Sequence, residues 1–232
     1  MIAPVDLARP VVVPPTIRPM PIVLAAALNA GAALLAWWAL GSTLQFLVAS
    51  LVIVTVTAPM LQPAGRSLLE RAILMQVCCD AVATVWLIVF LSASWGVLSW
   101  LLAYLLLTGW NATVSGTAIA LRWRVMPAIA TAMGLAFLSW PIWLATWRGE
   151  HAERFAAYAT TIHPVFALNA LLPDLGTWTH LPLSYQLMSL GQDVPFMPPA
   201  TLWPATLCWL LGAIGLWSGA VLRRRWLDRT PS

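Results

Sequence analysis

The sequence predicts an all-α integral membrane protein with six transmembrane helices, and three observations lead to this fold class. First, 61% of the 232 residues are hydrophobic and only 9% are charged, whereas about a quarter of a soluble domain is charged. Second, six apolar segments are long enough, at about 20 residues, to cross the hydrocarbon of a bilayer. Third, the arginines gather on one side of a six-span layout. Together these observations exclude a soluble enzyme, a secreted disulfide scaffold and a disordered tail protein.

The chain begins with a proline-rich tail and continues into closely spaced apolar runs. Residues 1–20 hold five prolines and three charged side chains, so we expect an extended cytoplasmic tail and no cleaved signal. Five spans follow within residues 21–147, and a sixth follows a long outer segment at 148–201. The predicted spans are residues 21–40, 44–61, 72–91, 95–120, 126–147 and 202–222. Because such runs lack alternation, they favour helices over the strands of a barrel.

Loop charge predicts the orientation of these spans. Ten of the twelve basic residues fall on one side if there are six spans, and every basic residue is Arg. The positive-inside rule then places both termini, including the basic tail 223–232, in the cytoplasm. The lysine-free, alanine-rich composition is typical of a GC-rich bacterial gene, so we expect the bacterial inner membrane. Because the arginines mark membrane edges and form no patch, nucleic-acid binding is not expected despite a pI near 9.5.

Tryptophan and cysteine fit a lipid environment. Seven of the fifteen tryptophans lie near predicted span ends, where their rings favour the membrane interface. These are Trp37, Trp38, Trp95, Trp123, Trp147, Trp203 and Trp226. A haem-handling or aromatic-substrate site would need a tight tryptophan cluster flanked by His, which the sequence does not show at short range. The three cysteines lie in apolar runs without C-x-x-C spacing, so neither a disulfide framework nor a zinc site is indicated.

The outer segment holds all three histidines and two predicted structural pieces. Helical spacing predicts a short interfacial helix that ends at His163-Pro164. Its spaced residues are Phe155, Tyr158, Ala159 and Ile162. The apolar run 165–172 is too short to span, so we expect it to dip into the membrane and return.

Enzymatic and metal-binding chemistry is weakly indicated in the outer segment. A metal site would recruit three histidines and two aspartates: His151, His163, His180, Asp174 and Asp193. The histidines are 12 and 17 residues apart, whereas zinc sites usually contain short-range pairs, so we favour polar residues that hold the loop. Ser184 and Ser189 lack a G-x-S-x-G elbow, and no nucleotide-binding motif is present. We therefore expect neither catalysis nor a cofactor in this chain.

One ionisable residue lies inside a predicted span. Asp80 falls near the middle of residues 72–91, and Gln76, Asp80 and Thr84 repeat every four residues on one helix face. Asn29 and Asn111 in other spans are possible hydrogen-bond partners. Intramembrane carboxylates are costly and are candidates for a proton or substrate contact. The alternative is polar glue between helices, often worth about 1 kcal/mol or less.

Small residues predict close helix contacts. Gly215 and Gly219 form a G-x-x-x-G pattern in the last span, while Gly109, Thr113 and Gly116 follow one side of the fourth. Small side chains let helix backbones approach closely in lipid. The contacts are either internal or between protomers, and in the second case the chain belongs to a homo- or hetero-oligomer.

The segment between the second and third spans carries a resemblance. Residues 63–71 contain Gly65, Glu70 and Arg71, which look like the glycine-then-Glu/Arg pattern of a coupling segment. With six spans and a long segment before the sixth, the layout resembles the membrane subunit of ABC-2-type exporters, although that family usually places a basic amphipathic helix before span 1. The resemblance implies that Arg66, Glu70 and Arg71 contact a separate ATP-binding subunit. It also implies that two such membrane subunits enclose the transport path.

Three hypotheses for function follow. The first is a transporter subunit, expected from the topology and from the lack of catalytic motifs in this chain. The second is a non-transporting accessory or assembly subunit of a larger membrane complex. The third, an intramembrane enzyme using Asp80 or the outer histidines, ranks last because these polar groups do not converge in the sequence. A partner ATPase discriminates the first from the second, and bound metal would favour the third.

Overall fold

Every secondary-structure element that the computed structural model describes is a helix. The structure describes residues 19–40, 43–61, 67–92, 96–121, 125–139, 158–170 and 201–227. In chain order the helices are α1 (Pro19–Ala39), α2 (Thr43–Met60), α3 (Leu68–Ser92), α4 (Val97–Leu121), α5 (Met126–Leu138), α8 (Pro164–Asn169) and α12 (Trp203–Leu227). No strand occurs among these residues, so the all-α prediction is confirmed for the described part of the chain.

Four helices are long and apolar enough to cross a membrane. They are α1, α3, α4 and α12, with 20 to 25 residues in each apolar stretch. Two shorter apolar helices, α2 and α5, accompany them. A helix of 20 residues rises about 30 Å, the thickness of the hydrocarbon layer. The chain is therefore a helical membrane protein.

The fifth predicted span is longer than the helix found there. The prediction covered 126–147, but α5 ends at Leu138 and Ser139 caps it with φ −100° and ψ 3°. Pro141 lacks an N–H and disfavours helical geometry at the residue before it, which explains an end at this point. The 13 residues of α5 rise only about 20 Å. Residues 140–147 lie outside the described residues.

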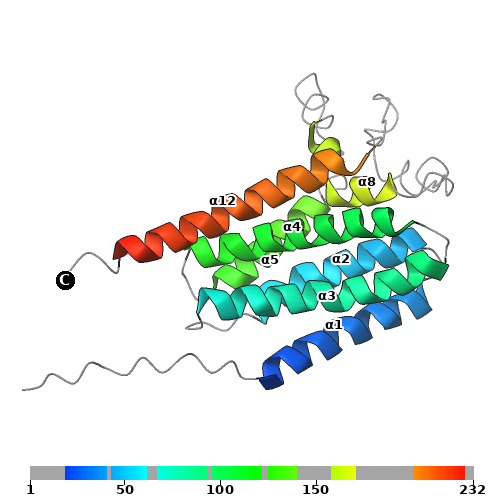
Figure 1. Ribbon diagram of the computed structural model, residues 1–232, viewed down its shortest axis with the longest axis horizontal. Coiled ribbons are helices and arrows are strands. Elements are labelled where there is room, and N and C mark those ends of the chain that lie inside the picture. Colours follow the sequence, from blue (N-terminus) through cyan, green and yellow to red (C-terminus); the bar gives the residue numbers. More distant parts are fainter. Residues whose placement is uncertain are drawn as a thin grey trace, which may run out of the picture.

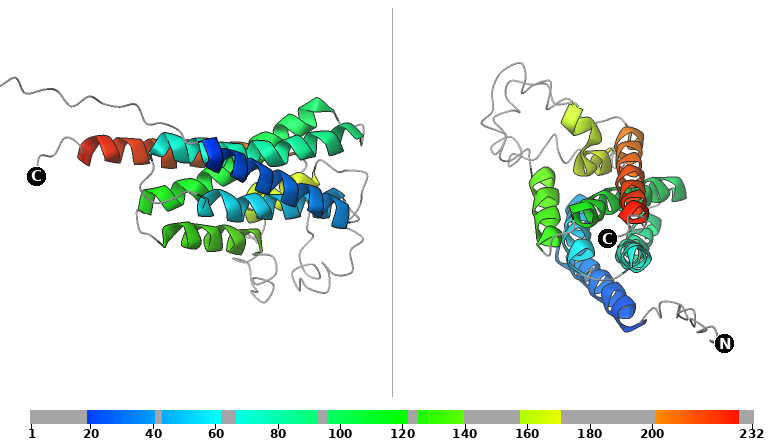
Figure 2. Two further views of the ribbon diagram at one scale, coloured as in Figure 1. Left: turned by 90° about the horizontal axis from the view of Figure 1, so that it is seen from below. Right: turned by 90° about the vertical axis from the view of Figure 1, so that its left-hand side faces the viewer.

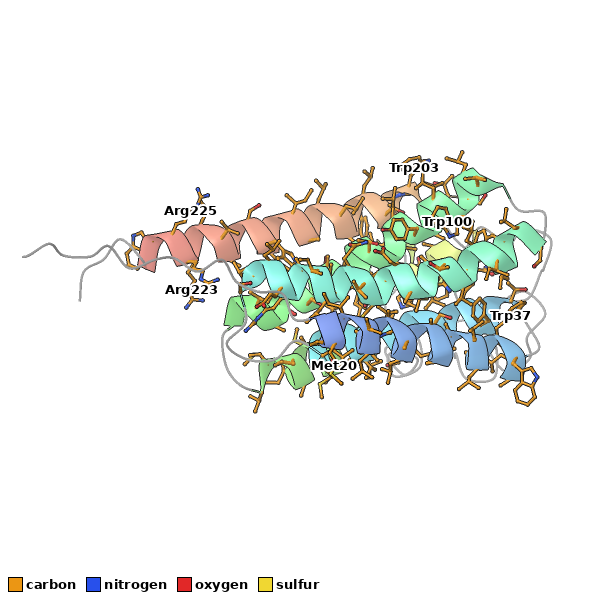
Figure 3. All side chains as sticks on the ribbon, turned by 60° about the horizontal axis from the view of Figure 1, so that its bottom comes forward. Met20, Trp37, Trp100, Trp203, Arg223 and Arg225 are labelled. Carbon is orange, nitrogen blue, oxygen red and sulfur yellow. The ribbon has the colours of Figure 1, made fainter. Side chains whose placement is uncertain are left out.

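The helices form one bundle with α4 at its centre (Figures 1 and 2). Helix α4 packs against α12, α3, α5 and α2, whereas α1 packs on α2 and α3 at the opposite side. Successive long helices alternate in direction, so the start of α1 and the end of α12 point toward the same end of the bundle (Figure 1). In Figure 3, Arg223 and Arg225 lie at that end, while Trp37, Trp100 and Trp203 lie toward the other.

The contact between α4 and α12 depends on small side chains. A Cβ added to Gly109 would lie 3.0 Å from the backbone nitrogen of Leu210, and one added to Gly116 would lie 3.0 Å from Cβ of Leu216. Thr113 donates from Oγ1 to the carbonyl oxygen of Trp209 at 2.9 Å. The predicted packing role of this side of α4 is confirmed.

The G-x-x-x-G pattern of α12 has a different position. A Cβ at Gly215 or Gly219 would meet nothing within 4 Å, so both glycines face away from the bundle. They make no close helix contact within the described residues. Internal packing, one of the two roles predicted for this pattern, is therefore not its role in this part of the chain.

The outer segment returns an apolar piece to the bundle. Residues 158–162 are helical, His163 interrupts the helix, and α8 follows directly. The side chains from Pro164 to Leu168 are buried, and α8 contacts α2, α4 and α12. Tyr158 is 77% exposed while Ala159 is buried, so the preceding turn has one outward and one inward side. The predicted break at His163 is found. Helix α8 covers only part of the apolar run 165–172, whose dip into the membrane stays a prediction, and Phe155 lies outside the described residues.

Candidate functional site

The structure places Asp80 at the midpoint of α3. Twelve residues of the helix precede it and twelve follow, and its side chain is exposed on the surface of the bundle. Translocon-based scales assign about 2.5–3.5 kcal/mol to an aspartate at the centre of a membrane helix. A carboxylate at this position is therefore expensive unless something satisfies it.

Two polar side chains hold the carboxylate in place. Gln76 donates from Nε2 to Asp80 Oδ1 at 2.8 Å, and the Tyr104 hydroxyl donates to the same oxygen at 2.8 Å. Gln76 Nε2 also lies 2.6 Å from the Tyr104 hydroxyl, to which it donates. We call Gln76, Asp80 and Tyr104 the Asp80 cluster. Its three members bridge α3 and α4 near the middle of the bundle.

The spacing of each helix positions this cluster. Gln76 and Asp80 are four residues apart, so they lie on one face of α3 as predicted. Thr84, the third member of the predicted stripe, donates to the backbone oxygen of Asp80 at 2.7 Å. Its hydroxyl is therefore used by the helix backbone, which leaves the carboxylate to Gln76 and Tyr104.

An aromatic pair on α4 supports Tyr104. Trp100, one turn earlier, stacks on Tyr104 with ring centroids 5.6 Å apart and planes 7° apart. Trp100 also donates from Nε1 to the carbonyl oxygen of Ala83 at 2.9 Å, which ties α4 to α3 (Figure 3). The phenol is thus held by stacking and by the neighbouring helix. The sequence analysis missed Tyr104. A buried tyrosine hydroxyl usually has a hydrogen-bond partner, so a tyrosine inside a predicted span could have suggested a partner for Asp80.

The Asp80 carboxylate has no cationic partner within the described ranges. Arg71 belongs to the same helix but lies nine residues nearer its start. Around the cluster the surface is apolar: Ile88 follows Asp80 by two helical turns and is 50% exposed, and Leu101 precedes Tyr104 by three residues and is 41% exposed. The site is therefore one carboxyl group, fixed in direction by two hydrogen bonds, on an open hydrophobic face.

Asn29 does not join this cluster. It is fully buried in α1, donates from Nδ2 to the carbonyl oxygen of Ala25 and accepts from the Thr57 hydroxyl at 2.6 Å. Its side chain also lies beside Cys78 of α3. Asn29 thus joins α1, α2 and α3, which is the role of interhelical polar glue.

Asn111 is also buried, and it bonds to its own helix. Its Nδ2 donates to the carbonyl oxygen of Leu107 at 2.9 Å. Among the described residues, Asn111 Oδ1 and the Ser115 hydroxyl one turn later have no hydrogen-bond partner. Neither asparagine is a hydrogen-bond partner of Asp80, whose partners are Gln76 and Tyr104.

A second cluster is aromatic, buried and built around His163. The Trp110 and Trp209 rings meet edge to face at 4.5 Å, and Phe137 lies within 5.5 Å of both. His163 stacks on Phe137 at 5.3 Å and contacts Phe166 at 4.8 Å. We call these five residues the His163 cluster. The sequence shows no tight tryptophan motif flanked by His, and this cluster instead forms from residues far apart in sequence that meet in the fold.

Hydrogen bonds to backbone secure the His163 cluster. His163 Nε2 donates to the carbonyl oxygen of Phe137 at 3.1 Å, and Trp209 Nε1 donates to that of Ile162 at 2.7 Å. Trp110 Nε1 donates to the Thr55 hydroxyl of α2 at 2.8 Å. His163 is 1% exposed, and burial lowers its pKa to about 4, so the ring is neutral near pH 7. The rings pack on one another, and their N–H groups donate to backbone oxygens or to Thr55, which fits an anchor for the outer segment.

The other predicted outer-segment residues lie outside the described residues. These are His151, His180, Asp174 and Asp193. Among the residues that the structure does describe, no three His, Cys, Asp or Glu side chains come together as metal ligands would.

The predicted coupling segment contains a helix cap. Ser67 donates from its backbone N–H to Glu70 Oε2 at 3.0 Å, and the Ser67 hydroxyl accepts from the Glu70 N–H at 3.2 Å. This reciprocal pair is a capping box, and it starts α3 four residues before the predicted span. The S-x-x-E spacing was visible in the sequence and was overlooked.

The other predicted coupling residues have separate positions. Arg71 is half-buried, and Arg224 of α12 is near enough for the two charges to repel. Arginines of α3 and α12 thus gather at one end of the bundle. Arg66 lies outside the described residues.

Comparison with known proteins found no matching family model, no similar characterised protein and no matching solved structure.

Proposed function

We propose that this chain is the membrane-spanning subunit of a transporter. The observation that carries the proposal is the Asp80 carboxylate, held at the midpoint of a membrane-length helix without a cationic partner among the described residues. Ionisable groups inside membrane segments mark ion, proton and substrate paths. A polar group with a purely structural role is better satisfied when it is buried and hydrogen-bonded. The Asn29 amide, which is buried between three helices, is an example in this chain.

The proposed topology has six spans with both termini in the cytoplasm of a bacterial cell. The alternating helices and the shared position of Arg71 and Arg224 support it, because the positive-inside rule gathers arginines on the cytoplasmic side. Helix α2, with 18 residues, rises about 27 Å, so a slight thinning of the bilayer lets it cross. Helix α5 needs residues beyond Ser139 to complete its crossing.

Energy for transport would come from another chain in this proposal. The sequence contains no nucleotide-binding loop, so an ABC-2-type arrangement with a separate ATP-binding subunit is the form that we propose. The docking surface would be the arginine-rich end, with Arg71 and Arg224. Glu70 contributes there by starting α3 through its capping box, whether or not it contacts a partner.

The proposal is tested by purifying the protein from its native membranes in a mild detergent. We expect a stoichiometric ATP-binding protein, identified by mass spectrometry, and ATP hydrolysis by the purified complex. Replacing Arg71 and Arg224 together by Gln should release that partner, while the double replacement of Arg148 and Arg154 by Gln, in the segment that the proposed topology puts on the opposite side, serves as a matched control. Purification in quantity with neither an ATP-binding partner nor ATP hydrolysis would overturn the ABC-2-type proposal.

Orientation has its own measurement. In a variant whose three native cysteines are replaced by alanine, single cysteines at Trp38 and Trp226 report the ends of α1 and α12. A membrane-impermeant maleimide added to intact cells should label position 38 and leave position 226 unlabelled until the cells are broken. The reverse pattern would contradict the N-in, C-in proposal.

A second candidate is a non-transporting accessory subunit, favoured by the outward face of α12. Gly215 and Gly219 leave an open strip on a helix that packs mainly on α4. Small residues of this kind let another helix approach closely. A stable native complex without an ATPase, broken by Gly215→Leu, would support this candidate over the transporter.

A further inference from the structure

We infer that the Asp80 cluster binds a monovalent lipophilic cation, such as a protonated amine or a quaternary onium ion. This inference deepens the proposed transporter function by naming its substrate class, and it rests on that function for its biological meaning. The binding itself is a property of the chain alone.

The charge of the cluster sets the sign of the ligand. Gln76 and Tyr104 both donate to Oδ1 of Asp80, and the other carboxylate oxygen, Oδ2, receives no hydrogen bond from the described residues. With Oδ1 held by two donors, the carboxylate is fixed in direction and Oδ2 remains open to a ligand. A cation at Oδ2 supplies the counter-charge that no described side chain supplies.

The aromatic pair beside the carboxylate favours an organic cation. Tyr104 shares its hydroxyl with the cluster, and Trp100 is stacked on Tyr104 and anchored to the backbone of Ala83. Aromatic rings attract cations through their electron-rich faces, and a quaternary ammonium beside Trp and Tyr is the recurring example. Because the pair is held by stacking and by hydrogen bonds, little ordering cost remains on binding.

The oxygen count disfavours small inorganic ions. Calcium takes six to eight oxygen ligands and magnesium six in strict geometry. The cluster offers one carboxylate, one phenol and one amide oxygen, and the Asp80 carbonyl already accepts from Thr84. These are still fewer than the six or more oxygen ligands that either ion takes. A weakly hydrated onium ion, which needs no full oxygen shell, suits this composition better.

The position of the site selects for lipophilic ligands. Asp80 and Thr84 are exposed on the bundle surface, and Ile88 and Leu101 continue the same faces with large exposed fractions. A ligand therefore reaches Asp80 from the side, through the hydrocarbon of the bilayer. Apolar substituents would pack along these side chains while the charged centre meets the carboxylate.

The test is equilibrium binding of radiolabelled tetraphenylphosphonium to the full chain in lipid nanodiscs. We expect saturable binding of about one cation per chain. Asp80→Asn should weaken it about a hundredfold, as loss of one partner of a charge pair does. Tyr104→Phe, which keeps the ring and removes the donor, should weaken it about threefold. Glu70→Gln removes a carboxylate from the same helix and keeps a residue that suits its capping box, so binding should be unchanged.

An anion of the same shape separates binding from partition. Radiolabelled tetraphenylborate, measured in a separate sample, should not bind saturably, whereas a quaternary ammonium such as tetrapentylammonium should compete with tetraphenylphosphonium. Equal binding by wild type and Asp80→Asn, or saturable binding of tetraphenylborate, would overturn the inference. If Asp80→Asn fails to yield folded protein, Tyr104→Phe and the borate measurement still decide the matter.

This experiment is independent of the ATPase test. Cation binding without an ATP-binding partner would keep the inference and remove the ABC-2-type proposal. An ATP-binding partner without Asp80-dependent cation binding would keep the transporter and remove this substrate class.

Discussion

The Asp80 cluster and the His163 cluster both place polar groups among apolar helices, but they satisfy them differently. In the His163 cluster, the imidazole and the indole of Trp209 donate to backbone oxygens, and His163 is 1% exposed. In the Asp80 cluster, the donors are side chains and the carboxylate stays exposed. A neutral group that is buried and bonded to backbone stabilises a fold. A carboxyl group left open on a hydrophobic face, as at Asp80, is a candidate binding site.

The largest expected effect is that a substitution in the Asp80 cluster changes cation binding, whereas one in the His163 cluster changes the free energy of unfolding. Asp80→Asn should weaken tetraphenylphosphonium binding about a hundredfold and shift the free energy of unfolding by about 0.5 kcal/mol or less, as exposed positions usually do. His163→Ala should do the opposite, leaving binding unchanged and destabilising by about 2–4 kcal/mol through a buried cavity. Binding isotherms and thermal unfolding in the same nanodiscs measure both. Destabilisation by Asp80→Asn with intact binding would reverse the comparison.

The next effect concerns the packing that holds α12 beside α4. Gly116→Leu forces a side chain against Leu216, where even a Cβ would lie 3.0 Å away, so we expect about 1–3 kcal/mol of destabilisation. Gly215→Leu is the matched control, because nothing lies within 4 Å of that position. Thermal unfolding of the two variants, followed by tryptophan fluorescence, makes the measurement. Equal stability of both would contradict the described packing.

A smaller effect is expected from a single hydrogen bond of the His163 cluster. Trp209→Phe keeps most of the ring contacts but leaves the Ile162 carbonyl without its donor, which should cost about 1–2 kcal/mol. Trp203→Phe, at a half-exposed position in the same helix, should be nearly neutral. Limited proteolysis of the outer segment should report the same difference, because the bond ties that segment to α12.

Stability should also depend on pH through His163. Its pKa is lowered to about 4 by burial, against about 6.5 in an unfolded chain. The unfolded state therefore binds more protons between these values, so stability is full above about pH 6.5 and falls as pH drops toward 4. Thermal unfolding at pH 7 and pH 4.5 should show this loss in the wild type. His163→Gln, which keeps a donor and does not titrate, should show a smaller loss.

The smallest effect concerns the start of α3. Ser67→Ala removes one side of the capping box and should destabilise by about 1 kcal/mol. Glu70→Gln keeps a capping residue while removing the charge, so its effect on stability should be smaller. The same variant can be tested in the ATP-binding complex. If Glu70→Gln keeps its stability but uncouples ATP hydrolysis from transport, the Glu70 charge has a role in coupling besides capping α3.

Much of the fold followed from local patterns. Apolar runs of about 20 residues predicted α1, α3, α4 and α12, and the break at His163-Pro164 was visible as well. The end of α5 at Leu138 was missed, although Pro141 marked it, because hydropathy continues past a proline that helical geometry does not tolerate well. Hydropathy indicates whether a segment prefers lipid or water, whereas backbone geometry and hydrogen bonding determine where its helix ends.

The candidate site was predicted only in part. The four-residue repeat of Gln76 and Asp80 is a property of one helix, so the sequence revealed it. The third member, Tyr104, lies 24 residues away from Asp80 on another helix. Nothing in the local pattern says which face of α4 meets α3, so the sequence suggested Asn111 as a partner and Tyr104 was missed.

The sequence by itself determined the solvent of this protein, its helical class and the gathering of its arginines, because these depend on composition and on spacing along one chain. Only the tertiary structure decided which polar groups meet. It buried Asn29 and His163 against partners, turned Gly215 and Gly219 outward, and left Asp80 exposed beside Tyr104. The physical reason is that the rotation and neighbours of each helix result from side-chain packing across the whole bundle. That packing depends on residues far apart in the chain, which no single helix specifies.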